Sequence, residues 1–223
     1  MFVEGKRGPE LDGALIRDLT RVSPSTLGHM TDFGFMRGLR PNMCPLKFAG
    51  LAVTVKIPHL DSTAVHCVLD IVKRGDVVVV DQSGDADRAC WGGGVSFAAK
   101  VKGVVGAVVD GAITDVAEIA ELQLPVFHRS VSALTTRILG LEGALNVPVS
   151  VGGVTVCPGD VVFADENGVA VLSAAEAKRL APILAAKEHG ELEMKQKLSS
   201  GQSLADLSGA RRLFETNRSQ KQN

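Results

Sequence analysis

Aromatic residues are scarce in this chain of 223 residues, which has no tyrosine, one tryptophan and eight phenylalanines. Proteins that bind single-stranded nucleic acid stack bases on such side chains, so this chain offers few platforms for them. Its 24 basic and 25 acidic residues are interspersed and give a formal net charge of −1. Because no basic stretch is available to meet phosphates, the composition argues against a nucleic-acid partner.

Cysteine is also rare, and long apolar runs are missing. The four cysteines, at positions 44, 67, 90 and 157, lie far apart without a CxxC pair. This spacing favours buried free thiols over a disulfide framework. No stretch approaches the roughly 18 uninterrupted apolar residues of a membrane helix. The sequence therefore predicts a cytoplasmic protein with no membrane partner.

Small apolar residues are abundant: 45% of the chain is hydrophobic and 22% is charged, which fits an α/β protein with buried strands. From residue 50 onward, apolar runs alternate with amphipathic ones. Strands are expected at 51–57, 77–80, 106–110 and 126–128, and helices at 62–73, 94–102 and 114–122. The segment Asp81 to Arg88 is expected to be a polar loop. Strands and helices alternating in this way predict parallel βαβ units.

The pattern changes after residue 140. Short β-rich runs at 147–151, 154–157, 161–164 and 169–172 are separated by turn sequences, which predicts a mostly antiparallel layer. Ser173 and Glu176 form a capping box that starts a long helix to about Leu198, with Pro182 expected to kink or restart it. We expect residues 1–198, including N-terminal helices, to form one domain and residues 199–223 to form a loosely held tail.

The most informative segment runs from Trp91 to Glu118. Its three glycines, Gly92–Gly94, open a short helix, where the N–H groups of Gly94, Val95 and Ser96 can bind a carboxylate or a phosphate. An ordinary tight loop is the alternative, because glycine triplets are common. Neither a GxGxxG nor a Walker A motif is present, so the loop is not a nucleotide-binding fingerprint.

Asp115 begins the next predicted helix, five residues after Asp110 and across a glycine-containing turn. A carboxylate at such a turn can hold a hard divalent cation through one direct bond and several waters. Its alternative role is to interact with the helix dipole and the unpaired N–H groups. Glu118 lies one turn later, where it can serve a metal-bound water, a partner subunit or solvent.

Other polar residues are less specific. Asp81, Asp85, Asp87 and Arg88 follow a buried strand, where they either line a site or belong to a solvated loop. The five histidines are scattered without the spacing of metal ligands. No Ser-His-Asp or Cys-His set can be proposed from the order of residues.

Taken together, these segments resemble the RraA-like family, which includes class II pyruvate aldolases acting on 4-hydroxy-4-methyl-2-oxoglutarate and related acids. The matching pieces, in order, are 46–54, 75–81, Trp91-Gly92 with the helix after it, 103–118 and 158–169. The resemblance implies an α/β/β sandwich with a parallel βαβ part, then an antiparallel β layer and a long C-terminal helix. It also implies a homotrimer or a dimer of trimers, with the site between subunits.

For the site, the resemblance implies that Asp115 binds Mg²⁺ or Mn²⁺ largely through waters and that Glu118 completes the catalytic pair. The substrate carboxylate would meet the backbone of Gly93, Gly94, Val95 and Ser96, with Thr114 beside it. The metal would polarise the keto oxygen and stabilise the pyruvate enolate left by carbon–carbon cleavage. The expected activity is that of a metal-dependent lyase, an aldolase or a decarboxylase, acting on a small 2-oxo acid.

Two residues depart from the aldolase pattern. Thr114 stands where aldolases have arginine, and Gly93 stands where they usually have an acidic or amide residue. Threonine cannot supply the bidentate, charge-assisted contact of an arginine. The alternative is therefore a non-catalytic, RraA-like regulator that acts by protein–protein binding. A methyltransferase is a third hypothesis. The sequence argues against it, because no glycine-rich motif for a methyl-donor nucleotide follows the first strand.

Overall fold

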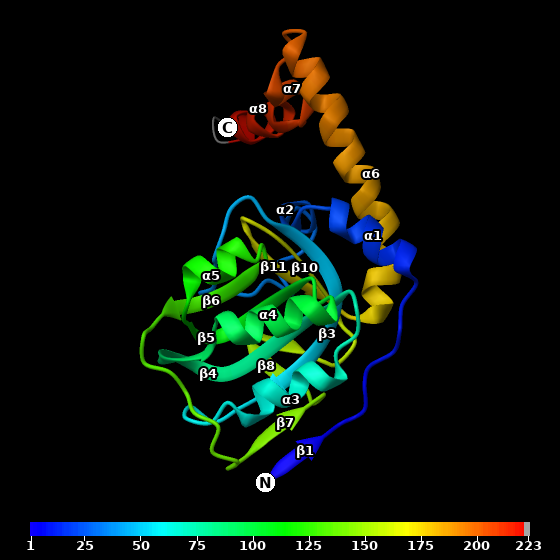
Figure 1. The fold of residues 1–223 in the computed structure, drawn as a ribbon. Helices are drawn as coiled ribbons and strands as arrows, with labels where there is room; N and C mark the ends of the chain where they lie inside the picture. Colours follow the sequence, from blue (N-terminus) through cyan, green and yellow to red (C-terminus); the bar gives the residue numbers. More distant parts are fainter. Residues whose placement is uncertain (221–223) are drawn as a thin grey trace.

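A computed structural model of the chain describes residues 1–220. Its centre is a mixed sheet whose main path runs β1-β7-β3-β4-β5-β6-β2, with β10 and β11 continuing from β3 (Figure 1). The parallel core consists of β3 (Lys47–Lys56), β4 (Asp76–Trp91), β5 (Gly106–Ile113) and β6 (Val126–Val131). The predicted βαβ units are confirmed.

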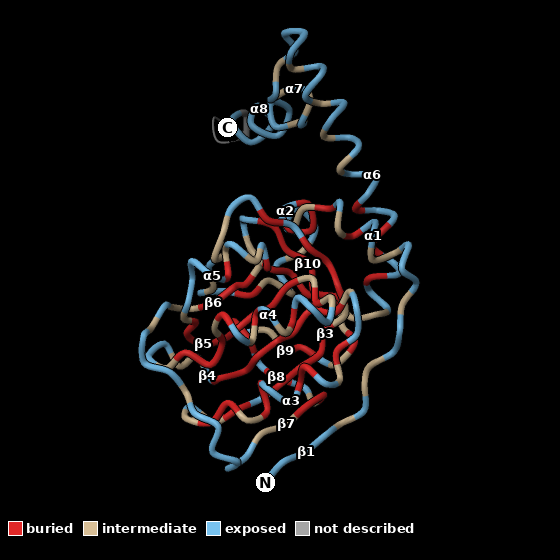
Figure 2. The backbone as a smooth tube through the Cα atoms, viewed as in Figure 1, coloured by how far each residue is buried: buried red, intermediate tan, exposed pale blue. Residues whose placement is uncertain are grey.

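Three helices connect these strands and cover one face of the sheet. They are α3 (Thr63–Ile71), α4 (Gly93–Lys102) and α5 (Val116–Glu121). Buried side chains on that face, such as Val80, Val109 and Trp91, form one apolar core with the helices. Figure 2 shows that the buried stretches of the chain gather in the central strands. Because alternate strand residues point to opposite faces, the other residues of the same strands, such as Val79 and Val108, build a second core behind the sheet.

The second core is covered by β structure. The strands β10 (Val161–Asp165) and β11 (Gly168–Leu172) form an antiparallel hairpin beside β3, and β8 (Val149–Val151) pairs with β9 (Val154–Val156) in a separate small sheet. Helices, central sheet and hairpin make the predicted α/β/β arrangement, with the antiparallel part after the parallel part, as expected.

Two aspartates attach the small hairpin to the central sheet. Asp81 and Asp110 are neighbours in register on β4 and β5. Asp81 accepts a hydrogen bond from Ser150 N–H at 3.2 Å, and Asp110 accepts one from Gly152 N–H at 2.9 Å. Lys56 lies 3.4 Å from Asp81, and Arg129 forms an ion pair with Asp110. Each buried carboxylate is therefore balanced by a cation, which buried charges require.

The expectation that Asp81 to Arg88 form a polar loop is wrong. These residues belong to the long strand β4, but its pairing with β5 shifts between Asp81 and Asp85 and again between Asp85 and Ala89. Ser83 and Gly84 both have positive φ, 56° and 74°. The strand thus bulges outward here, and the polar sequence that indicated a loop reflects these extra, unpaired residues.

Short elements complete the N-terminal part. β1 (Phe2–Glu4) pairs with β7 (Gly143–Leu145), and β2 (Arg40–Pro41) pairs with β6. The predicted helices are α1 (Gly13–Arg21) and α2 (Pro24–Gly28), with Ser23 as N-cap and proline in the first turn. They pack with α6 against β10 in a third apolar cluster that includes Leu19, Leu27 and Leu184.

The C-terminal helix α6 (Ala174–Ser199) starts at the predicted capping box of Ser173 and Glu176. Pro182 lies inside it without restarting the helix, contrary to one of the two expectations. The described part of the predicted tail contains α7 (Leu204–Leu207) and α8 (Ala210–Gln220). Figure 1 shows α6 leaving the body and carrying both short helices with it. Residues 221–223 lie outside the described residues.

All four cysteines are free, as expected, but only Cys90 is buried. The expectation that the thiols are buried is therefore wrong for Cys44, Cys67 and Cys157. Cys67 lies on a helix whose core positions are taken by valine and leucine, which leaves its own face to solvent. Among the described residues, no helix is both long and apolar enough to cross a membrane.

Candidate active site

The residues of the predicted site lie where β4 and β5 end side by side. Trp91, the last residue of β4, is paired with Ile113 at the end of β5, and Thr114 N–H donates to Trp91 O at 2.9 Å. The chain enters α4 directly after Trp91 and α5 shortly after Thr114. Two helix N-termini therefore meet at the carboxyl edge of the sheet, where ligands of α/β proteins commonly bind.

The start of α4 presents backbone donors. Gly92 is the N-cap, and the first turn contains Gly93, Gly94 and Val95. Gly93 N–H donates to Asp115 Oδ2 at 2.9 Å, and Ser96 N–H donates to Gly92 O at 3.0 Å. In the described part of the chain, the N–H groups of Gly94 and Val95 have no protein acceptor. These two donors, with the positive end of the helix, are suited to an anion.

Ser96 is placed differently from the prediction. Its side chain is fully buried, and its Oγ accepts a hydrogen bond of 2.7 Å from Trp91 Nε1. Since its N–H is also used within the helix, Ser96 fixes the tryptophan under the loop and has no N–H to offer a ligand. Gly93 N–H is likewise occupied, by Asp115. The predicted four-residue cradle is therefore reduced to Gly94 and Val95.

Asp115 is exposed and has a left-handed backbone, with φ 54° and ψ 40°. It occupies the N-cap position of α5 but makes no side-chain cap to that helix. Instead, Oδ2 accepts from Gly93 of the neighbouring helix, and Oδ1 accepts from Thr114 Oγ1 at 3.3 Å. An ionised carboxylate has about four lone-pair positions, so acceptor capacity remains for another ligand. Aspartate is among the residues that tolerate this backbone conformation.

Both acidic side chains press against the glycines of the loop. A Cβ added at Gly92 would lie 2.7 Å from Asp115 Oδ2, and one added at Gly93 would lie 2.0 Å from Glu118 Oε2. Both distances are too short for real contacts. The glycine at position 93 therefore leaves the space that the Glu118 carboxylate fills. The departure from the aldolase pattern at this position is accompanied by an acidic group that reaches the same place from α5.

The carboxylate oxygens at this place fit a hard divalent cation that takes only one or two ligands from the protein. Asp115 and Glu118 offer carboxylate oxygens beside the same glycine pair, and Mg²⁺ is commonly held by one or two carboxylates with water completing its shell. Among the described residues, no group of three or more His, Cys, Asp or Glu side chains could hold a metal. A fully protein-ligated site is thus not built here, whereas a water-rich one is compatible with these two residues.

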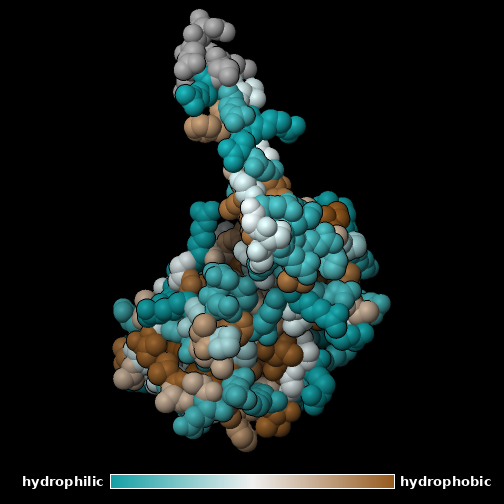
Figure 3. Space-filling view, turned by 90° about the horizontal axis from the view of Figure 1, so that it is seen from above, coloured by the Kyte–Doolittle hydropathy of each residue, from teal (hydrophilic) through white to brown (hydrophobic). Residues whose placement is uncertain are grey.

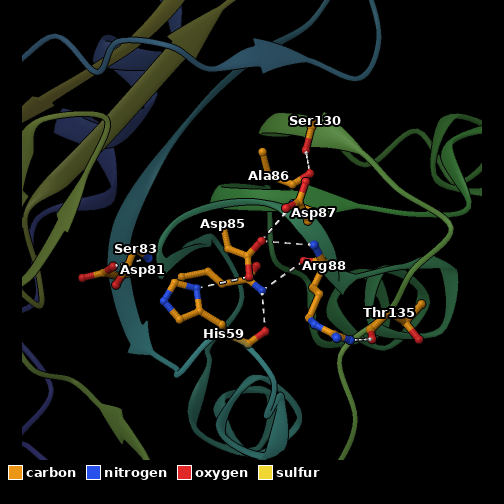
Figure 4. Close-up of polar contacts among 10 residues, drawn as sticks. His59, Asp81, Ser83, Asp85, Ala86, Asp87, Arg88, Ser130 and Thr135 are labelled. Carbon is orange, nitrogen blue, oxygen red and sulfur yellow. Dashed lines mark hydrogen bonds and ion pairs between the residues drawn. The ribbon is translucent and has the colours of Figure 1, made fainter.

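The bulge of β4 forms a separate polar cluster (Figure 4). Asp85 Oδ1 accepts hydrogen bonds from Asp87 N–H at 2.8 Å and Arg88 N–H at 3.2 Å, while Oδ2 lies 3.1 Å from His59 Nδ1. Burial opposes ionisation of Asp85, but these contacts together lower its pKa below the ordinary value. The Asp85 carboxylate therefore stabilises the turn through these hydrogen bonds. The structure favours this structural role over the binding of a ligand.

Among the described residues, no hydrogen bond joins Thr114 to an arginine; its hydroxyl bonds to Asp115 and its N–H to Trp91 O. Arg88 belongs to the bulge, where its Nη1 lies 3.5 Å from Thr135 O. Arg129, which could not be singled out from the sequence, directly follows a predicted strand and pairs with Asp110. Asp110 shares its sheet face with Val108, toward the hairpin, so this ion pair belongs to the side away from α4 and α5.

The chain belongs to the RraA-like family: the family model described as Aldolase/RraA matches residues 15–171. This confirms the resemblance drawn from the sequence. Two kinds of relative are found within that family, enzymes by name and inhibitors of RNA processing.

Among the first kind is a protein of Halalkalibacterium halodurans named "Putative 4-hydroxy-4-methyl-2-oxoglutarate aldolase". It is 40% identical over 123 residues, which are 55% of this chain and 58% of that protein. The chain thus matches little more than half of that relative's length.

Among solved structures, Streptomyces coelicolor RraAS2, described as an unusual member of the RNase ES inhibitor RraA protein family, matches with a TM-score of 0.74 and 32% identity. The match covers 85% of this chain and 98% of RraAS2. The RNA-processing inhibitor RraA from Thermus thermophilis matches with a TM-score of 0.60 and 28% identity, over 67% of this chain and 91% of that one. Both likenesses support the α/β/β fold.

Proposed function

We propose that the protein is a divalent-metal-dependent lyase that cleaves or decarboxylates a small 2-oxo acid and releases pyruvate through its enolate. The observation that carries this proposal is the convergence of Asp115 and Glu118 on the start of α4, beside the unpaired N–H groups of Gly94 and Val95. Aldolase names among the relatives agree with this class of reaction.

Each residue has a defined task in this proposal. Gly94 and Val95 N–H bind the substrate carboxylate, and Asp115, held in place by Gly93 N–H, is the direct ligand of Mg²⁺ or Mn²⁺. The bound cation supplies positive charge that polarises the keto oxygen. Glu118 holds an adjacent water and accepts or returns the proton of the reaction.

Thr114 sets the expected level of activity. Its hydroxyl donates one neutral hydrogen bond, and in the structure that bond goes to Asp115 Oδ1. Losing one charge-assisted contact to a developing oxyanion typically costs about 3 kcal/mol, or on the order of a hundredfold in rate. We therefore expect slow turnover of the usual substrates of the family, or a substrate whose own groups replace the arginine.

Further parts of the proposal concern the whole protein. We expect residues 1–198 to act as one catalytic domain, in a homotrimer or a dimer of trimers, with the open side of the Asp115 site closed by a neighbouring subunit. The hollow of about 410 Å³ at the base of α6 is lined by none of the proposed site residues, so it is separate from the proposed site. A cytoplasmic location remains a prediction.

The test is pyruvate release from oxaloacetate and from 4-hydroxy-2-oxo acids with Mg²⁺ or Mn²⁺. Asp115→Asn should abolish metal-dependent turnover, and Glu118→Gln should lower kcat at least tenfold. The matched control is Glu121→Gln on the same helix, an exposed residue without a part in the site, which should leave the rate unchanged. No turnover over background in the wild-type protein, or equal turnover in Asp115→Asn, would contradict the proposal.

The second candidate is a regulator that acts by binding another protein. It is supported by Thr114, which lacks the charge of the aldolase arginine, and by the likeness to inhibitors of RNA processing. For the test, this protein is prepared once with EDTA and once with Mg²⁺, and each preparation is mixed with a purified RNase E-type ribonuclease. A regulator of this kind should bind the ribonuclease and slow its RNA cleavage equally in both preparations. Cleavage is measured after the ribonuclease has received its own metal again. Inhibition in that assay without pyruvate release would favour this candidate.

A further inference from the structure

The C-terminal arm is defined here as the second half of α6 together with α7 and α8, residues 186–220. Among residues 1–218, whose burial the structure describes, Leu184 is the last buried one. Figure 3 shows the arm as a narrow projection that reaches past the outline of the body. Within the arm, Met194, Leu198 and Leu207 are half-buried, so a small contact holds its helices together.

The last helix of this arm has an apolar face with nothing against it. On α8, Ala210, Leu213 and Phe214 are spaced i, i+3 and i+4 and therefore lie on one side. Leu213 is 61% exposed and Phe214 is 69% exposed. Three adjacent apolar residues on an amphipathic helix are the pattern by which helices bind in grooves of other proteins.

A groove of matching character lies at the base of α6. The hollow of about 410 Å³ is bordered by Met30 and Phe33 on the chain after α2, by Val171 and Leu172, and by Leu180 of α6. Phe33 is 84% exposed at its rim. Met30, also exposed, borders the same hollow, so the rim offers more than one apolar side chain to a partner.

The charges of the helix and the groove are complementary. On α8, Arg211 pairs with Asp206 of α7, and Arg212 and Arg218 against Glu215 leave an excess of one positive charge. The groove contains Asp160 and Glu176 against Arg179, an excess of one negative charge. Burial is the main reason that the pKa of Asp160 is raised, and the nearby Glu176 carboxylate adds a smaller increase.

The groove and the apolar helix of one chain are held apart. Ser173, Glu176 and Arg179 border the groove at the first turns of α6, whereas α8 follows its far end (Figure 1). A helix of 26 residues is about 39 Å long, so α6 acts as a rod that keeps α8 away from its own groove. The groove of another copy has no such restriction.

We propose that α8 of one copy docks its Leu213–Phe214 face into the groove at the base of α6 of a second copy, and that the second copy returns the same contact. Such reciprocal exchange gives a two-fold interface in which each arm is used once and each groove is filled once. The arm lies after residue 171, the last residue matched by the family model.

The test uses the full-length protein in sedimentation velocity experiments over a range of concentrations. Phe214→Glu and Phe33→Lys should each halve the mass of the assembly. Thr216→Glu is the matched control, because it adds the same charge to α8 on the side opposite Phe214 and should leave the mass unchanged. Since Phe214, Phe33 and Thr216 are all exposed, loss of folding is not expected, and circular dichroism checks this.

The double variant Phe214→Glu with Phe33→Lys decides whether the two residues meet. Opposite charges at one contact should restore the mass that either single variant loses. The proposal is overturned if the wild-type protein and Phe214→Glu sediment alike. It is also overturned if Phe33→Lys has no effect, because the arm would then dock on another surface, or if the double variant stays dissociated.

Discussion

At the scale of single residues, the proposed site depends on a small residue making room for an acidic one. Gly93 is buried, and its lack of a side chain allows the Glu118 carboxylate to lie against its Cα. Gly94 is exposed, and a Cβ there would meet no atom within 4 Å. Two adjacent glycines in the same turn of α4 thus differ sharply in what they permit.

This difference gives a matched pair of variants. Gly93→Ala should displace Glu118 and lower the metal-dependent rate at least tenfold, with a melting temperature within about 3 °C of wild type, because the clash is with the end of a flexible side chain. Gly94→Ala should leave the rate within twofold. The measurement is pyruvate release alongside thermal unfolding. Equal rates for both variants would show that the position of Glu118 does not matter for turnover.

At the scale of elements, buried aspartates connect segments that are distant in sequence. Asp81 and Asp110 hold the β8–β9 hairpin, and Asp61 holds the segment before β7 to the start of α3. Asp61 is fully buried and accepts from Thr63 N–H at 2.9 Å, Leu139 N–H at 3.1 Å and Leu141 N–H at 2.6 Å. Asp61 was not identified from the sequence, and the structural role of Asp81 and Asp110 was not predicted, since isolated aspartates carry no sign of their distant backbone partners.

Asp61 predicts a dependence of stability on pH. Burial raises its pKa, but the hydrogen bonds from Thr63, Leu139 and Leu141 outweigh burial and leave the pKa well below the ordinary value. A depressed folded-state pKa contributes stability that is present above the unfolded pKa, about 3.9, and is lost as pH falls toward the folded pKa. Asp61→Asn should therefore lower the free energy of unfolding by about 2 kcal/mol at pH 7.

The measurement is urea unfolding of both proteins between pH 3 and pH 7. The difference between wild type and Asp61→Asn should narrow as pH falls below 4, since the wild-type carboxylate then loses its advantage. Asp87→Asn is the control, because Asp87 is exposed at the tip of the β4 bulge. A constant difference across the whole range would mean that the ionised form of Asp61 is not what holds the segment.

At the scale of the whole molecule, the sequence predicted the layers of helices and strands better than the irregular parts of the strands, such as the bulge in β4. Alternating apolar runs gave the parallel strands, and the Glu166-Asn167-Gly168 turn gave the β10–β11 hairpin. The bulge in β4 could not be predicted, because Asp85 replaces missing strand pairing with bonds to its own turn and to His59. The Arg129–Asp110 pair was missed for a similar reason: its partners come from different strands.

The sequence also indicated which residues of the proposed site lie close together. Its glycines and Asp115 are brought together as the sequence indicated, since both follow the ends of adjacent parallel strands. What could not be predicted is which N–H groups remain available. Asp115 takes the donor of Gly93, and Ser96 turns inward to Trp91, a division set by side-chain geometry rather than by spacing.

Thiol accessibility offers a test of the whole fold. Three cysteines are exposed, and Cys90 is fully enclosed between sheet and helices, where burial raises its pKa to about 12. A thiol-reactive chromophore should therefore label three groups in the native protein at pH 8 and a fourth only after denaturation. Rapid labelling of four thiols without denaturant would contradict this packing.

The left-handed backbone of Asp115 affects how that position should be probed. Alanine there removes the charge and also places an unsuitable residue at φ 54°, so a loss of activity would have two causes. Asparagine keeps the local conformation and removes only the negative charge, and glycine relaxes the conformation entirely. Comparing these two replacements separates the electrostatic contribution of the side chain from the geometric demand of the turn.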